Sequence, residues 1–131
     1  MNEKIELIIP AKAENISVAR LTASSIGMKM KLSIDEIEDI KLCVGEACNI
    51  LLQKSNIDKD DSIYIEFLIS EDIDISVSTK KSKSKKSIEF VNDKELTYAR
   101  MILQTLMDCV EVDLNDDIKI IMKKDMEKID E

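Results

Sequence analysis

Few residues in this chain have the chemistry of a catalyst, and the commonest catalytic residue is absent. The sequence contains no histidine, which removes the usual general base and the usual metal ligand of proteins. Its three cysteines, Cys43, Cys48 and Cys109, lack the C-x-x-C spacing of a metal or redox motif. We interpret them as reduced thiols in a protein core rather than as metal ligands or a disulfide framework. Carboxylates and amides remain as candidates for a functional site.

One segment places such groups at helical spacing. Residues 39, 42, 46, 49 and 53 are spaced by three or four positions, as on one face of a helix, and this face is mostly polar. A single helical glutamate is most often a solvated surface charge, so Glu46 in this segment is either that or a site residue. The face comprises Asp39, Leu42, Glu46, Asn49 and Gln53.

The overall charge limits the partners of the chain. Its formal net charge is −8, which argues against nucleic-acid binding and against an anionic membrane surface. No stretch approaches the ~20 apolar residues of a membrane-spanning helix, and the apolar run 5–9 is too short for a signal peptide. We therefore expect a cytoplasmic protein without direct nucleic-acid or membrane contacts. The five lysines of residues 80–86 could attract a polyphosphate, form a solvated loop or dock on an acidic partner.

Length and hydrophobic pattern predict the architecture that must position these residues. The 131 residues, 44% of them hydrophobic, fit one domain, which we expect over residues 1–124 with a charged tail at 125–131. The pattern predicts an α+β fold, a two-layer sandwich of a mostly antiparallel sheet with about three helices on one face. The expected strands are 4–9, 62–69, 72–79, 88–91, 110–114 and 118–122, and the expected helices are about 15–32, 33–55 and 94–108.

Helix starts and glycines refine this prediction. Asn15 or Ser17 is expected to cap the first helix, and Ser33 with Glu36 forms the pattern of a capping box at the second. The chain has only two glycines, Gly27 and Gly45, and both fall inside predicted helices. A glycine-rich phosphate loop is therefore missing from the sequence.

The second predicted helix carries a family resemblance. Residues 34–52, IDEIEDIKLCVGEACNILL, resemble a helix of bacterial anti-sigma factors, the serine-kinase branch of the histidine-kinase-like (GHKL) ATPase fold. Residues 5–10 and 13–23 match the first strand and helix of that family, and 105–110, TLMDCV, match the helix after its second glycine box. The resemblance spans about residues 4–123 with one gap, and implies the GHKL fold with its lid lost.

The resemblance also implies roles for individual residues. Glu46 matches a glutamate that helps to activate the attacking hydroxyl, although here we expect the position to be inherited and inactive. One turn later the family has an asparagine that holds Mg²⁺, and this chain has Ile50, which has no oxygen to offer a hard cation. The adjacent Asn49 is a candidate cofactor-binding residue, but one residue turns the side chain by ~100°. Arg20 matches a partner-binding position, or is a simple surface arginine.

Other parts of the nucleotide site are absent from the sequence. The family places an adenine-binding aspartate and glycines after the strand 72–79, where this chain has its lysine run. Residues 97–100 stand where the second glycine box should approach the phosphates, and each has a Cβ that prevents a close backbone approach.

These observations lead to two principal hypotheses. The first is a pseudokinase: an anti-sigma-factor-like regulator that binds a sigma factor and a STAS-type anti-anti-sigma protein, with no nucleotide cofactor and no metal. The alternative is an active serine-protein kinase that uses ATP and Mg²⁺ with Glu46 to phosphorylate that antagonist. A third possibility is a relative in fold alone with an unrelated partner. The family further implies a homodimer through its first strand and helix, and Ile5, Leu7 and Ile9 alternate on a predicted edge strand.

Overall fold

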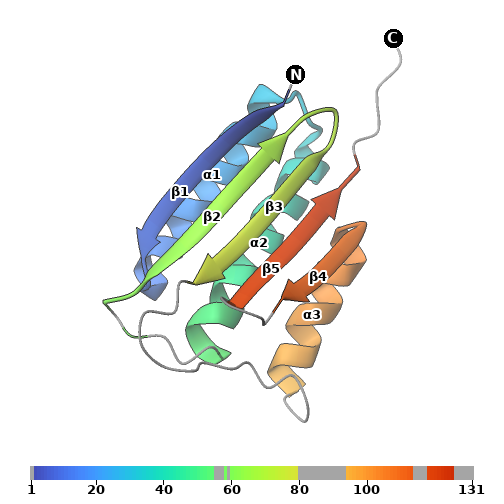
Figure 1. The fold of residues 1–131 in the computed structure, drawn as a ribbon. Coiled ribbons are helices and arrows are strands. Elements are labelled where there is room, and N and C mark those ends of the chain that lie inside the picture. The colour runs from blue at the N-terminus through green and yellow to red at the C-terminus, as the bar shows by residue number, and fades with distance from the viewer. Residues whose placement is uncertain (1, 55–57, 59, 80–93, 114–117, 126–131) are drawn as a thin grey trace.

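The computed structural model describes residues 2–54, 58, 60–79, 94–113 and 118–125. Helices follow the first and third strands, so the chain passes repeatedly between two layers (Figure 1). In chain order the elements are β1 (Glu3–Pro10), a 3-10 turn η1 (Ala13–Asn15), α1 (Ile16–Lys29), α2 (Ile34–Lys54), β2 (Ser62–Ile69), β3 (Ile73–Thr79), α3 (Lys94–Leu106), β4 (Cys109–Asp113) and β5 (Ile118–Lys124).

The five strands form one sheet in the order β1-β2-β3-β5-β4. Every pair of neighbouring strands is antiparallel, and β1 and β4 are the two edges. The helices cover one face of this sheet, and the other face is open in the described part of the chain (Figure 1). The predicted α+β two-layer sandwich is confirmed.

Alternation along the central strands builds the core. In β2 the side chains of Ile63, Ile65 and Phe67 are at most 1% exposed, whereas their neighbours in the strand point to the open face. Full burial of such a side chain contributes roughly 1.5–3 kcal/mol to the free energy of folding, so the contact of these strands with the helices stabilises the two-layer arrangement. The helix layer completes the core with residues that α2 buries: Ile40, Cys43, Val44, Ala47, Cys48, Ile50 and Leu51.

The start of α1 differs from the sequence prediction, because neither expected residue caps it. Asn15 Nδ2 donates to the carbonyl of Pro10 (3.1 Å), and Ser17 Oγ donates to the carbonyl of Glu14 (3.3 Å). Asn15 has φ −90° and ψ −6°, since the turn η1 precedes it. A capping side chain requires an extended backbone at its own residue, and the 3-10 turn has replaced that conformation.

The end of α1 is also earlier than predicted, at Lys29 instead of about residue 32. Lys31 has a left-handed backbone with φ 59°. Its N–H donates to the carbonyl of Met28, and the N–H of Leu32 donates to the carbonyl of Gly27, both at 3.0 Å. These two bonds form a Schellman motif, which ends the helix and turns the chain toward α2.

Both glycines lie inside helices, as predicted, at places where α1 and α2 touch. A Cβ at Gly27 would lie 2.8 Å from Cγ1 of Ile37, and a Cβ at Gly45 would lie 3.2 Å from Cδ of Arg20. The two glycines therefore allow α1 and α2 to approach each other closely.

The C-terminal half shows smaller shifts and one correction. α3 ends at Leu106 and β5 extends to Lys124, because the N–H of Asp108 donates to the carbonyl of Lys123 (2.9 Å) and draws the chain into the sheet. Cys43 and Cys48 are buried free thiols, but Cys109 is exposed, so the prediction of a core thiol was wrong there. Cys109 starts the edge strand β4, where its side chain points away from the helix layer.

Several predicted features lie outside the described residues. They are the strand at 88–91, the lysine run at 80–86 and the tail beyond residue 125. Within the described part, no helix is long and apolar enough to cross a membrane.

Candidate functional site

A capping box sets the start of α2, the helix that carries most of the candidate residues. The N–H of Glu36 donates to Ser33 Oγ (3.1 Å), and the N–H of Ser33 donates to Glu36 Oε1 (3.0 Å). Two N–H groups that the helix leaves unpaired thus have hydrogen-bond partners, and the negative carboxylate of Glu36 interacts favourably with the positive end of the helix dipole. The predicted capping box is confirmed, and it fixes the register of α2.

One partly buried lysine contacts both α2 and α3 from the sheet. Lys124 Nζ donates to the carbonyl of Leu106 at the end of α3 (2.8 Å) and lies 3.8 Å from Asp39 Oδ2 on α2. The last turn of α3 contains no basic residue of its own, so Lys124 supplies the cation that a helix C-terminus favours. Asp39 faces this junction, and positions 43, 46 and 50 follow on the same side of α2 at helical spacing.

Cys43 lies in the middle of that side and is not a nucleophile. Burial, then the carboxylate of Asp39, raises the pKa of the Cys43 thiol to about 12; Lys124 lowers it and Glu46 raises it. The thiol is therefore protonated at neutral pH.

Glu46, Asn49 and Ile50 have different surroundings. Glu46 and Asn49 are half-buried, whereas Ile50 is 4% exposed and belongs to the hydrophobic core. A hydrocarbon side chain in the core offers no oxygen to Mg²⁺, so the residue one turn from Glu46 does not fit a metal ligand. In the described ranges, no group of three or more cysteine, aspartate or glutamate residues could hold a metal ion.

Thr79 is a polar residue that the sequence analysis did not select. It is the last residue of β3, its side chain is 0% exposed, and its Oγ1 has no hydrogen-bond partner within the described residues. β3 ends at the same end of the molecule as the C-terminal part of α2 (Figure 1). The alternation of side chains along the strand could have predicted that Thr79 is buried, but it could not have predicted whether its hydroxyl has a hydrogen-bond partner.

Arg20 is a residue of α1, and its side chain lies against α2 at Gly45. Three successive atoms of its side chain, Cγ, Cδ and Nε, lie 3.6, 3.2 and 3.7 Å from the position that a Cβ of Gly45 would occupy. Arg20 is exposed, and its guanidinium has no ion-pair or hydrogen-bond partner in the part of the chain that the structure describes. The structure thus brings Arg20 next to the residue that precedes Glu46.

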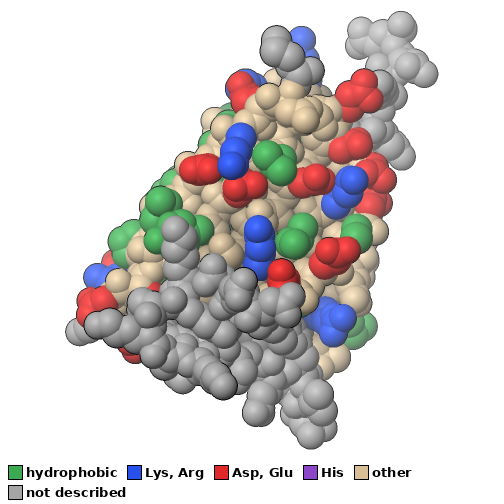
Figure 2. All heavy atoms as spheres, in the orientation of Figure 1, with side chains coloured by type: hydrophobic (Ala, Val, Ile, Leu, Met, Phe, Trp, Pro, Cys, Tyr) green, Lys and Arg blue, Asp and Glu red, His purple; other side chains and the backbone are tan. Residues whose placement is uncertain are grey.

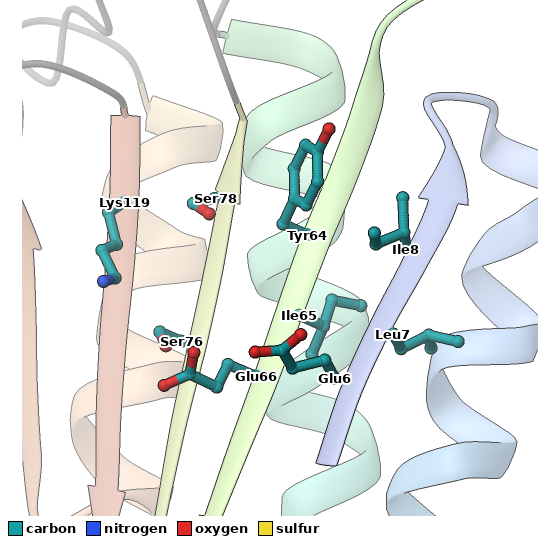
Figure 3. Close-up of a pocket in the computed structure, with 9 residues that line it drawn as sticks. All are labelled: Glu6, Leu7, Ile8, Tyr64, Ile65, Glu66, Ser76, Ser78 and Lys119. Atoms are coloured by element: carbon teal, nitrogen blue, oxygen red, sulfur yellow. The ribbon is translucent and has the colours of Figure 1, made fainter. Parts of the chain in front are cut away.

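The open face of the sheet has a depression of its own, away from α2. Its volume is about 310 Å³, and the small side chains of Ser76 and Ser78 form part of its lining beside Tyr64 (Figure 3). Glu6 and Glu66 are directly opposite residues of β1 and β2. This face carries scattered acidic, basic and hydrophobic side chains (Figure 2).

A lysine relieves the repulsion between those two glutamates. Lys4 Nζ lies 3.2 Å from Glu6 Oε1 and 3.5 Å from Glu66 Oε2. The hydrogen bond to Glu6, followed by the charge of Glu66, raises the pKa of Lys4. Like charges directly opposite on neighbouring strands are destabilising, and the shared lysine offsets this effect.

Comparison with curated proteins identifies relatives along almost the whole chain. The serine-protein kinase RsbW of Bacillus pumilus (strain SAFR-032) is 34% identical over 147 aligned positions, which cover 95% of this chain and 88% of the relative. The serine-protein kinase RsbW of Bacillus mycoides (strain KBAB4) is 30% identical over 137 positions, covering 93% and 84%. The chain belongs to the RsbW family. No model in the scan of protein families matches it.

Membership in the RsbW family confirms the resemblance to anti-sigma factors of the serine-kinase branch. The structure places Arg20 against Gly45, the residue that precedes Glu46 in α2. Thr97 and Arg100, which we expected in place of the second glycine box, are exposed on α3, and Ala99 is buried. The helix α2 is therefore present, and Ile50, one turn after Glu46, belongs to the hydrophobic core.

Proposed function

We propose that this RsbW-family chain is an anti-sigma-factor-like regulator that acts by binding other proteins, and that its nucleotide site does not work. The burial of Ile50 carries the proposal. Its side chain is 4% exposed in the core, one turn from Glu46, where an oxygen ligand for Mg²⁺ would be needed. Glu46 then keeps an inherited position without a catalytic role, and Asn49 points too far around the helix to replace the missing ligand.

The proposed partners are a sigma factor and a STAS-type anti-anti-sigma protein in the cytoplasm. Arg20 is the proposed contact residue, since its guanidinium is exposed and lacks a partner among the described residues of an acidic chain. An exposed arginine of this kind can form a bidentate pair with a carboxylate. We propose no direct contact with nucleic acid or with a membrane.

The alternative is an active kinase, which the names of the relatives favour. The relatives at 34% and 30% identity are named serine-protein kinases. By the family resemblance, Glu46 keeps the position of the glutamate that activates the attacking hydroxyl. In that case ATP and Mg²⁺ would be the cofactors, and the STAS-type protein would be the substrate. A phosphate-transfer assay with that protein separates the two functions, because the regulator would bind it without phosphorylating it.

We further propose a homodimer built on β1 and α1. β1 is an edge of the sheet, so its outer backbone groups have no strand partner in the described part of the chain. Beside it lies a shallow depression of about 440 Å³, lined by Ile5, Val18, Leu21 and neighbouring residues. Val18 and Leu21 are 44% and 67% exposed, as expected of apolar residues that a second copy covers. A single-chain mass by light scattering at micromolar concentration would contradict the dimer.

The domain assignment stays a proposal as well. We propose one domain over residues 1–124, which agrees with the end of β5 at Lys124, and a charged tail at 125–131. Deleting residues 126–131 should leave the thermal unfolding temperature unchanged, since most of them are charged and we expect them to form a tail. A large drop in that temperature would show that the tail belongs to the domain.

Capture of partners tests the principal proposal. Wild-type chain and Arg20→Glu, immobilised at equal density, are exposed to native cytosol, and the bound proteins are identified by mass spectrometry. Retention of a sigma factor and a STAS-type protein by the wild type, with loss of both by Arg20→Glu, supports the proposal. Equal retention by the two chains would show that Arg20 is not at the interface. Capture of neither protein by the wild type would contradict the assigned function.

A further inference from the structure

Arg20 reaches the surface by lying over a glycine, and this contact has a consequence for binding. Cγ, Cδ and Nε of Arg20 are all within 3.7 Å of the point where a Cβ of Gly45 would stand. Gly45 itself is buried while Arg20 is exposed, and the arginine stem lies over the glycine. Any other residue at position 45 would occupy part of the space that now holds the stem.

We propose that Gly45 is a positioning residue: it seats the side chain of Arg20 and so directs the guanidinium toward an acidic group of a partner protein. The inference rests on the proposed function, in which Arg20 contacts the partner. Arginine has several rotatable bonds and costs about 2 kcal/mol of rotamer entropy when it is fixed. A seat that restricts the stem before binding reduces that cost and improves affinity.

The contact between Arg20 and Gly45 also connects the proposed partner-binding residue to the helix that carries Glu46. Gly45 immediately precedes Glu46 in α2, and Arg20 belongs to α1. A displacement of α2 at Glu46 therefore changes the surface on which the arginine stem rests. Binding at Arg20 and the position of α2 are expected to depend on each other.

Substitution of Gly45 by alanine can distinguish a positioning role from a structural one, because it should raise the stability of the fold but lower the affinity for the partner. Alanine favours a helix interior over glycine, so Gly45→Ala should raise Tm by about 2–4 °C. Its Cβ, 3.2 Å from Cδ of Arg20, displaces a flexible stem rather than a rigid neighbour. If Gly45 positions Arg20, Gly45→Ala should raise stability and lower the affinity for the partner. If Gly45 has only a structural role, the variant should be more stable and bind the partner as well as the wild type does.

The position of Arg20 can be measured without a partner. The chain contains two arginines, Arg20 and Arg100, so a ¹⁵N-labelled sample gives two side-chain Nε–H signals, which Arg100→Lys assigns. Gly45→Ala should shift the Arg20 signal and leave the Arg100 signal in place. Unchanged signals for both arginines would overturn the proposal, whatever partner the protein has.

A double-mutant cycle then measures the effect on binding. The binding partners are the purified sigma factor and STAS-type protein retained by the wild type, titrated against wild type, Gly45→Ala, Arg20→Ala and the double variant. Gly45→Ala should weaken affinity roughly three- to tenfold, a part of what a charge-assisted hydrogen bond contributes. In the Arg20→Ala background the same change should have no effect, because the positioned group is gone.

The outcomes distinguish the two levels of inference. If Arg20→Ala weakens binding and Gly45→Ala does not, Gly45 is not a positioning residue although the proposed surface stands. If Gly45→Ala weakens binding equally in both backgrounds, it acts independently of Arg20 and the proposal is wrong. If Arg20→Ala has no effect on affinity, the proposed partner surface itself is wrong, and the seating of Arg20 has no role in binding.

Discussion

Gly27 of α1 lies against Ile37 of α2 with no room for a side chain between them. A Cβ at this glycine would be 2.8 Å from Cγ1 of Ile37 and 3.6 Å from both its Cβ and Cδ1. Ile37 is branched at Cβ and half-buried, so it cannot move aside as the stem of an arginine can. The two glycines of the chain therefore differ in what alanine would do to them.

We predict that Gly27→Ala destabilises the domain. Forcing an extra methyl into this contact costs about 1–3 kcal/mol, while the better helix propensity of alanine returns about 1 kcal/mol. The free energy of unfolding, measured by urea denaturation, should therefore fall by up to about 2 kcal/mol. Combined with Ile37→Ala, which removes Cγ1, the same change should become neutral or stabilising. An equal loss in both backgrounds would show that the helix contact is not the cause.

A second prediction concerns the buried hydroxyl of Thr79. Burial of a polar group without a hydrogen bond costs about 1–3 kcal/mol, and valine has nearly the same shape without that group. Since Oγ1 has no partner in the described residues, Thr79→Val should raise the free energy of unfolding by about 1 kcal/mol or more. Ser78→Ala, one residue earlier on the open face, serves as a control with little expected effect. A loss of stability in Thr79→Val would show that the hydroxyl is bonded after all.

Sequence reasoning predicted the sheet well and the helix ends poorly. Strand β2 begins and ends where the alternation predicted, because a period of two assigns every side chain to one face. The capping box of Ser33 and Glu36 was predictable for a similar reason, since it is a local pattern. The end of α1 was not, because Lys31 adopts a left-handed backbone that glycine usually supplies, and no local signal marks that choice.

The third prediction tests the junction at Lys124. Lys124→Met keeps the buried stem but removes the hydrogen bond to Leu106 and the cation beside Asp39, which should cost about 1–3 kcal/mol. Asp39→Asn should cost less, because the pair is 3.8 Å apart and the carboxylate is partly exposed. Hydrogen exchange should increase first in the last turn of α3. Lys123→Met, at the exposed neighbour, should change neither exchange nor stability.

The candidate site divides into parts that a motif reveals and parts that only packing reveals. Glu46, Ile50 and Arg20 were found because each matches a position in a short sequence pattern. The seat of Arg20 on Gly45 joins residues 25 positions apart, and no helical period connects them. Contacts of this kind depend on how two helices cross. A hydrophobic pattern predicts which face of a helix is in contact, but not which atoms meet.

The last prediction is that MgATP binds weakly or not at all. By the family resemblance, we expect three parts of the nucleotide site to be missing. They are an aspartate that reads the adenine, an asparagine that holds Mg²⁺ and glycine amides around the phosphates. Each such contact contributes roughly 1.5–3 kcal/mol. Their joint loss removes on the order of 5–8 kcal/mol, although such contributions do not strictly add. A micromolar site corresponds to about −8 kcal/mol, so little affinity should remain.

Titration calorimetry at physiological ionic strength measures this affinity. Attraction of the triphosphate to the lysine-rich run at 80–86 should weaken as salt is added, whereas a specific site should not. Glu46→Ala is the matched variant, since it removes the half-buried carboxylate of α2 without touching the core. A saturable micromolar signal that Glu46→Ala abolishes would contradict the pseudokinase and favour the active kinase, because the burial of Ile50 would then be compatible with a working nucleotide site.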